Sequence, residues 1–173
     1  MSDPAFRPRK MLEILVKHEV EFILIGGVAQ YLHGGPFPTV DVDVVPNLQT
    51  SNLDRLAEAI TELEARLRDA KEPKGLPISL NGKTLKKALP EFRFLRLMTK
   101  YGYLDLLYEP AGTEGFQDLN RSAVKKRFGP AVEVSVASLA DVIRSKQAVG
   151  RARDLEQLPT LRRLLEMQNE PEE

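Results

Sequence analysis

Two aspartates separated by a single residue, Asp41 and Asp43, are well placed in this sequence for chemistry. They lie in the alternating run TVDVDVV, which is typical of a β-strand. Because side chains alternate across a strand, both carboxylates should leave on one face, about 6 to 7 Å apart along the strand. Carboxylate oxygens at that spacing can share hard cations such as Mg²⁺. The pattern therefore predicts a metal site that Asp41 and Asp43 hold.

A glycine pair, Gly26 and Gly27, follows the apolar run over 22–25, which predicts a buried strand ending at the glycines. A backbone without Cβ atoms can turn sharply and let a phosphate approach its N–H groups. The helical turn expected over 28–32 would direct the partial positive charge of its N-terminus the same way. A triphosphate could then lie between the glycine amides and carboxylate-bound Mg²⁺.

A third acid, Asp105, stands inside the run YLDLL. An unpaired carboxylate among leucines would be costly, so we expect Asp105 to have a partner. One alternative is a salt bridge to Arg93 or Arg96 across a hairpin whose strands we predict over 92–99 and 103–108.

The string GGVAxxLHGxxxxTxDxD resembles the nucleotidyltransferase superfamily signature, in the branch that contains the AbiEii and MenT-type toxin nucleotidyltransferases. The resemblance implies an α/β (α+β) polymerase β-like fold, with a mixed sheet flanked by helices and C-terminal helices closing the site. It implies transfer of a nucleotide from an NTP to an acceptor hydroxyl, on tRNA 3′ ends for the MenT-type members. It also implies that Asp105 completes a catalytic, Mg²⁺-binding set with Asp41 and Asp43.

The same resemblance extends to the C-terminal stretch SKQAVGRARDLEQL. There it implies that Lys146 and Asp154 belong to the catalytic residues, that Lys146 and Arg151 bind the triphosphate, and that Asp154 holds one of these cations in place. Lys146 and Asp154 would share one side if a single helix continued through this stretch, and ordinary helical ion pairing with Glu156 is the alternative.

The loop before the two aspartates also bears on nucleotide binding. Thr39 lies two residues before Asp41 on the same strand face, so its hydroxyl could bond a phosphate oxygen. The sequence departs from many relatives here, because Phe37 and Pro38 stand where those have a basic residue.

Composition sets the wider limits. The chain has 173 residues, with 25 Lys and Arg balanced by 25 Asp and Glu, so only a local basic patch could bind RNA. The absence of Cys excludes disulfides, thiolate zinc sites and Cys nucleophiles. The N-terminus lacks an apolar signal region and no run of 18 apolar residues occurs, so we expect a cytoplasmic protein without a membrane anchor. We divide the chain into a nucleotidyltransferase core, 1–137, and a C-terminal helical segment, 138–173.

Hydrophobic spacing predicts the remaining elements. We expect helices over 9–19, from Leu53 to about Ala70, over 138–149 and from Pro159 or Thr160 onward, and a strand over 132–136. Residues 71–90 should form an irregular loop. Two basic groups could contact RNA or simply be solvated: Lys83, Lys86 and Lys87 in that loop, and Arg121, Lys125, Lys126 and Arg127 beside Phe128.

Two other functions remain open from sequence. The chain could be a non-catalytic domain that binds RNA or a protein partner such as an antitoxin. The run DVDVV also fits the start of haloacid-dehalogenase-like phosphatases. The favoured hypothesis is a Mg²⁺-dependent nucleotidyltransferase that uses an NTP, acts on tRNA and serves as the toxin of a toxin–antitoxin pair.

Overall fold

The computed structural model describes residues 4–36 and 38–170. Its strands are β1 Phe22–Ile25, β2 Asp41–Pro46, β3 Arg66–Leu67, β4 Leu76–Pro77, β5 Phe94–Thr99, β6 Gly102–Leu107, β7 Val124–Arg127 and β8 Glu133–Val136. Its helices are α1 Pro8–Lys17, α2 Gly26–Leu32, α3 Thr50–Glu62, α4 Gly82–Phe92, α5 Phe116–Asn120, α6 Leu139–Val149 and α7 Ala152–Asn169.

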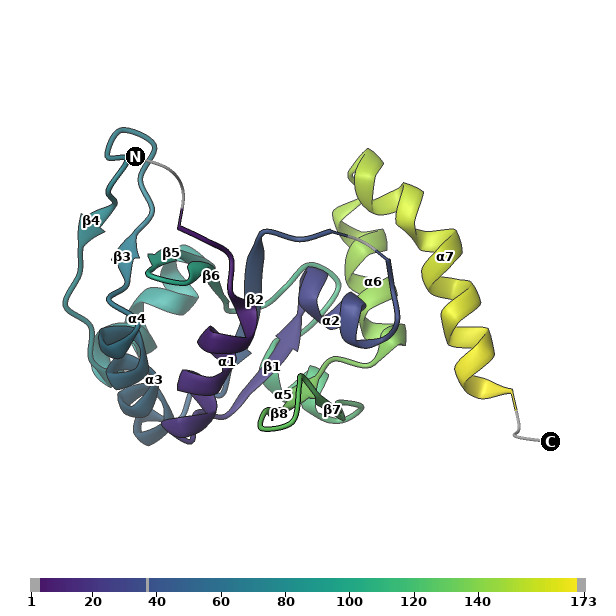
Figure 1. Ribbon diagram of the computed structural model, residues 1–173, viewed down its shortest axis with the longest axis horizontal. Helices are drawn as coiled ribbons and strands as arrows, with labels where there is room; N and C mark the ends of the chain where they lie inside the picture. Colours follow the sequence, from purple (N-terminus) through teal and green to yellow (C-terminus); the bar gives the residue numbers. More distant parts are fainter. Residues whose placement is uncertain (1–3, 37, 171–173) are drawn as a thin grey trace.

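The strands form one mixed sheet in the order β4-β3-β5-β6-β2-β1-β8-β7 (Figure 1). β2 pairs antiparallel with β1 and parallel with β6, and β1 pairs parallel with β8. β5 and β6 form the antiparallel hairpin expected from the sequence. The predicted fold class, a mixed sheet flanked by helices, is therefore confirmed.

Alternation along the central strands gives the sheet two different faces. On β2 the side chains of Val42 and Val44 are fully buried, as are Leu104 and Leu106 on the neighbouring β6. These apolar side chains belong to the core, which α1, α3 and α4 help to form. The acidic side chains at the intervening positions leave on the opposite face.

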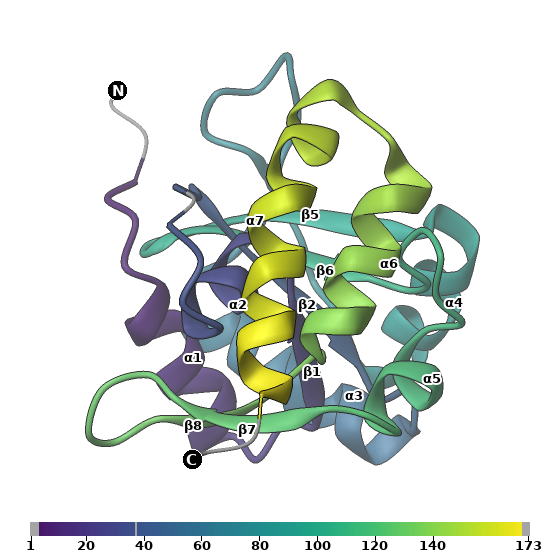
Figure 2. The ribbon, with the colours of Figure 1, turned by 90° about the vertical axis from the view of Figure 1, so that its right-hand side faces the viewer.

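The C-terminal helices lie beside α2, on the other side of the molecule from β3 and β4 (Figures 1 and 2). α6 packs against α2 and against α7. No helix within 4–36 and 38–170 is both long enough and apolar enough to cross a membrane.

The prediction of one helix from Leu53 to about Ala70 is wrong at its C-terminal end. α3 ends at Glu62, and Glu64 adopts a positive φ of 53° that ends the helical hydrogen-bonding pattern. Leu67 keeps helical spacing with Leu63, but it pairs with β5 as part of β3. Apolar residues therefore keep helical spacing beyond the residue at which the helix ends.

The expected irregular loop over 71–90 is also wrong, because α4 begins inside it. Asn81 caps this helix by accepting a hydrogen bond from the Thr84 backbone N–H at 2.9 Å, and the Thr84 hydroxyl accepts one from Asn81 N–H at 2.8 Å. Leu85 and Leu89 follow four residues apart and are fully buried. Lys83, Lys86 and Lys87 therefore lie on a helix.

Two further local predictions differ from the structure. The last helix begins at Ala152, earlier than the expected start at Pro159, and Pro159 lies within it. The basic segment over 124–127 is the edge strand β7, so Lys125, Lys126 and Arg127 lie on a strand at the edge of the sheet.

Candidate active site

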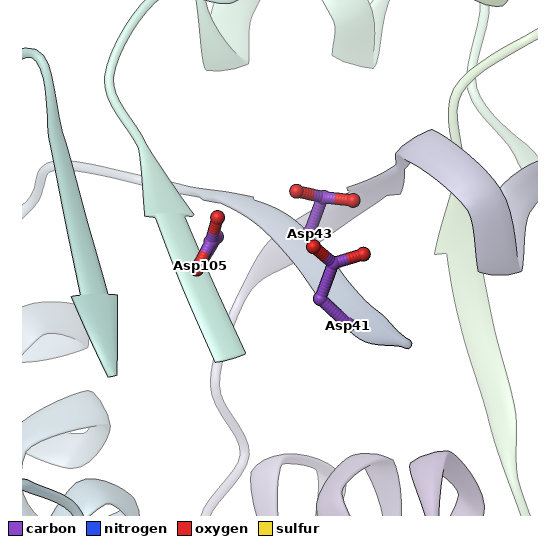
Figure 3. Close-up of side chains that lie close together, drawn as sticks. All are labelled: Asp41, Asp43 and Asp105. Carbon is purple, nitrogen blue, oxygen red and sulfur yellow. The ribbon is translucent and has the colours of Figure 1, made fainter. Parts of the chain in front are cut away.

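Strand register brings the three acids together. In the parallel pair of β2 and β6, Asp43 lies directly opposite Asp105, and Asp41 lies opposite Tyr103. Each aspartate offers one carboxylate oxygen to a group whose members all lie within 4.8 Å of one another (Figure 3). Three carboxylates converging on so small a volume form the kind of oxygen-rich site that hard divalent cations prefer.

The electrostatics of these acids also fit a cation. Burial, and then the negative charges of Asp41 and Asp105, raise the pKa of Asp43 to about 8. Burial, followed by the charge of Asp41, raises the pKa of Asp105 to about 6, although Arg96 and Arg68 oppose the rise. Without a bound cation the fold therefore holds these carboxylates in an environment that disfavours their charge.

Asp105 has a partner as well as a place among the acids. Arg96 Nε lies 3.6 Å from Asp105 Oδ2, whereas Arg93 pairs with Glu109 at 2.6 Å. The other oxygen of Asp105, Oδ1, is buried and has no hydrogen-bond partner in the described part of the chain. The ion pair with Arg96, which was the alternative role for Asp105, thus leaves one carboxylate oxygen available to a ligand.

The glycine turn is shaped by these carboxylates. Gly26 has a φ of +75°, and a Cβ atom at this position would overlap the carboxylate of Asp43. At Gly27 a Cβ atom would overlap the side chain of Thr39, whose hydroxyl donates to Asp41 Oδ1 at 3.1 Å. The absence of side chains at both positions therefore lets β2 and the start of α2 approach closely.

The C-terminal helices contribute an ion-pair group centred on the buried Asp154. Lys146 Nζ donates to Asp154 Oδ1 at 2.9 Å, and Arg151 Nε donates to Asp154 Oδ2 at 2.8 Å. Burial alone would raise the pKa of Asp154, but the hydrogen bonds from these two cations outweigh it and lower the pKa. The hypothesis was that Asp154 holds one of these cations, and in the structure it pairs with both.

The contact forms without one continuing helix. Lys146 and Asp154 would share one side only if a single helix ran through both, and the helix predicted over 138–149 ends before Asp154. The structure agrees with that end, because α6 stops at Val149, Gly150 follows with a φ of +67°, and α7 begins at Ala152. The side chains of Lys146 and Asp154 therefore meet across the junction between two helices. Within the described residues the ion pairs of Lys146 and Arg151 are with Asp154, and not with Glu156, which was the alternative considered from sequence.

A cleft of about 310 Å³ joins these groups. Its walls come from the sheet on one side and from α6 and α7 on the other. All of the predicted site residues line it: Gly26, Gly27, Thr39, Asp41, Asp43, Asp105, Lys146, Arg151 and Asp154. Pro38 also lines the cleft, while Phe37 lies outside the described residues.

Sequence reasoning missed two glutamines in this cleft, Gln30 and Gln157. Each has a buried side-chain oxygen without a hydrogen-bond partner among the described residues. Gln30 comes one helical turn after Gly26, and Gln157 comes three residues after Asp154, so helical spacing from the predicted site could have found both.

No protein-family model and no curated protein sequence matches this chain. Among solved structures, it resembles TM1012 from Thermotoga maritima, which is described as a candidate nucleotidyltransferase, with a TM-score of 0.50 and 16% sequence identity over 95% of this chain and 97% of that one. JHP933 from Helicobacter pylori aligns with a TM-score of 0.43 and 18% identity over 92% of this chain and 68% of that one. Taken with the mixed sheet and its flanking helices, the likeness to TM1012 shows that this chain has the nucleotidyltransferase fold.

Proposed function

We propose that this protein is a Mg²⁺-dependent nucleotidyltransferase that moves a nucleotide from an NTP to an acceptor hydroxyl. The observation that carries the proposal is the meeting of Asp41, Asp43 and Asp105, with oxygens within 4.8 Å of one another, beside the turn of Gly26 and Gly27. The proposed metal ligands and the glycine turn therefore line the same cleft.

The three aspartates are the proposed ligands of Mg²⁺. Their fit rests on all-oxygen chemistry, on the raised pKa of both Asp43 and Asp105, and on the unpartnered Oδ1 of Asp105. When bound, Mg²⁺ would supply charge stabilisation for an in-line displacement at a phosphorus atom.

The remaining roles follow from where each side chain lies. Asp105 is the proposed acceptor of the proton from the attacking hydroxyl. Lys146 keeps donor hydrogens beyond the one bonded to Asp154, and with Arg151 it would stabilise negative charge on the leaving pyrophosphate. The backbone N–H groups at Gly26 and Gly27, with the Thr39 hydroxyl, would orient the triphosphate.

We further propose that the acceptor is the 3′ end of tRNA and that the protein is the cytoplasmic toxin of a toxin–antitoxin pair. The support for this finer assignment is the resemblance of the glycine and aspartate motifs to the AbiEii and MenT-type branch. A cognate antitoxin would then be its protein partner.

The test is incubation with total tRNA and each labelled NTP in Mg²⁺, followed by gel electrophoresis. We expect a labelled RNA band with the wild-type protein and none with Asp41→Ala or Asp43→Ala, provided that each variant keeps the wild-type circular dichroism spectrum. Transfer retained in either variant would contradict the assignment. A labelled band at the protein's own mass would show that the acceptor is protein and not RNA. Absence of metal-dependent NTP binding in isothermal titration would favour the non-catalytic alternative.

A further inference from the structure

The sheet face that carries the three acids continues beyond them onto β5 and β3. Cross-strand pairing places Arg96 opposite Asp105 and Phe94 opposite Leu107, so these side chains share the face of the acids. The side chain of Arg96 is 56% exposed and Phe94 is 47% exposed. Half of each side chain therefore faces solvent on this part of the sheet, in contrast to the buried opposite face.

Two arginine–aromatic stacks occupy this exposed region. The Arg96 guanidinium lies over the ring of Phe94, with 5.0 Å from its central carbon to the ring centroid. The Arg68 guanidinium lies over the ring of Tyr103 at 4.3 Å. The backbone N–H of Arg68 donates to the carbonyl of Arg96 at 2.8 Å, which fixes the two stacks side by side. We call Arg68, Phe94, Arg96 and Tyr103 the platform.

The chemistry of the platform favours a polynucleotide strand. An arginine that lies over an aromatic ring presents a planar cation that can stack on a base or contact a phosphate. Arg68 has no carboxylate within ion-pairing distance in the described part of the chain, so its charge is available to an anionic partner. Aromatic and arginine side chains on an open sheet are also how several RNA-binding domains hold unpaired bases.

The platform is continuous with the acidic site. Arg96 lies in the wall of the cleft and contacts Asp105, while Tyr103 is the strand partner of Asp41. A polynucleotide strand lying on the platform would therefore bring its terminal hydroxyl next to the proposed proton acceptor and metal ligands.

We propose that the platform binds the unpaired 3′ end of the acceptor RNA, with its bases stacked on the arginine–aromatic pairs and its phosphates held by the arginines. This inference rests on the proposed function and adds to it the surface and the single-stranded character of the acceptor. The lysines of α4 form a competing basic surface, because Lys83, Lys86 and Lys87 are exposed but do not line the cleft.

The experiment measures fluorescence anisotropy of a labelled ten-nucleotide RNA, single-stranded or annealed to its complement, without Mg²⁺ or NTP. The variants are Phe94→Ala and Arg68→Ala. Their matched controls are Phe92→Ala, an aromatic residue 58% exposed at the end of α4, and Lys87→Ala. Arg96 is left unchanged because it contacts Asp105.

We expect Phe94→Ala to weaken single-stranded RNA binding roughly 5- to 100-fold without changing its salt dependence, since a stacking contact is lost. Arg68→Ala should weaken binding and reduce the slope of log affinity against log salt by about 0.7, since one phosphate contact is lost. Both controls should bind as the wild type does, and the duplex should bind more weakly than the single strand.

Each contrary result bears on a particular claim. Unchanged binding in both platform variants, loss of binding in Lys87→Ala, or equal affinity for the duplex would overturn the platform. If the wild type binds single-stranded RNA through the platform but transfers no nucleotide to any RNA, the proposed function fails while the platform stands. If transfer occurs and Phe94→Ala leaves both RNA affinity and the KM for RNA unchanged, only the platform fails.

Discussion

At the scale of single residues, the acids at the cleft reduce the stability of the metal-free fold. Asp43 would ionise near pH 4 in an unfolded chain, but in the fold its pKa is about 8, because burial and two neighbouring carboxylates disfavour its charge. The folded state therefore binds a proton that the unfolded state releases across this whole range. A side chain retained at such a cost is better explained by a ligand than by packing.

Asp43→Asn should therefore stabilise the metal-free protein increasingly as pH rises toward 7.5. Since the folded-state pKa is the higher one, stability is greatest at low pH and falls as pH rises from about 4 to about 8, by about 1.4 kcal/mol per pH unit for one group. The variant removes this group, so its free energy of unfolding should decline less steeply. Urea denaturation in EDTA at pH 5.5, 6.5 and 7.5 measures both slopes.

Added Mg²⁺ provides the control for that prediction. Because a cation favours ionised carboxylates, saturating Mg²⁺ should raise wild-type stability most at pH 7.5 and should do little for Asp43→Asn. Equal slopes for the two proteins in EDTA would show that Asp43 is ionised in the metal-free fold and would remove this support for the metal site.

Removing Asp154 should lower the free energy of unfolding more than removing Arg151. Asp154 is only 3% exposed and holds both cations, so Asp154→Ala leaves Lys146 buried without its partner and should cost on the order of 3 kcal/mol in unfolding free energy. The side chain of Arg151 is 72% exposed, so Arg151→Ala should cost less than about 1 kcal/mol. Chemical denaturation at neutral pH compares them, and equal losses would mean that Asp154 is not the centre of the group.

At the scale of elements, the turn between β1 and α2 carries the most demanding geometry. Gly26 combines a positive φ with direct contact to the Asp43 carboxylate, so an added methyl group meets both backbone strain and overlap. Gly34 has a positive φ of +92°, but a Cβ atom there would meet only Leu164 Cδ2, at 4.0 Å. Comparing substitutions at the two positions therefore distinguishes the effect of backbone strain from the effect of overlap with Asp43.

We expect Gly26→Ala to abolish Mg²⁺-dependent NTP binding and Gly34→Ala to preserve it. Backbone strain alone should cost Gly34→Ala about 1 kcal/mol of stability, and Gly26→Ala should lose more because Asp43 must also move. Isothermal titration with a non-hydrolysable NTP analogue, alongside urea denaturation, measures both effects. Normal NTP affinity in Gly26→Ala would show that the close approach of the turn to Asp43 is dispensable.

The elements also show how far sequence alone reaches. The two-residue period of β2 predicted that Asp41 and Asp43 share a face, because a strand's alternation is a local property. The position of Asp105 depends on the pairing of β2 with β6, which only the folded chain specifies, so sequence left an ion pair and a metal site both open. In the structure Asp105 contacts Arg96 and lies among the acids as well.

Errors in the element predictions have equally specific causes. Leu67 extended the apolar spacing of α3 past Glu64, whose left-handed backbone is not encoded by a glycine. α4 was missed since its only buried large apolar residues are Leu85 and Leu89, among lysines and a proline. The spacing of apolar residues therefore predicted which side of an element is buried better than it predicted where the element begins or ends.

At the scale of the whole molecule, the cleft is assembled from segments far apart in the chain. β2 and β6 supply the acids, the start of α2 supplies the glycine turn, and α6 and α7 supply the cations. The chain carries no net formal charge, so attraction of a polyanion must come from this local separation of acidic and basic groups. A ligand in the cleft would contact both the sheet and the C-terminal helices and would hold them together.

Binding should therefore stabilise the entire fold. A non-hydrolysable NTP analogue with Mg²⁺ at about one hundred times its Kd should add about 2.7 kcal/mol, which for a chain of this size raises Tm by roughly 5 to 10 °C. Either component alone should give a smaller shift, because the carboxylates repel an unaccompanied triphosphate. Differential scanning fluorimetry of the wild type and Asp41→Asn decides the matter. A full shift in the variant, or one that persists in EDTA, would place the nucleotide somewhere other than beside the three acids.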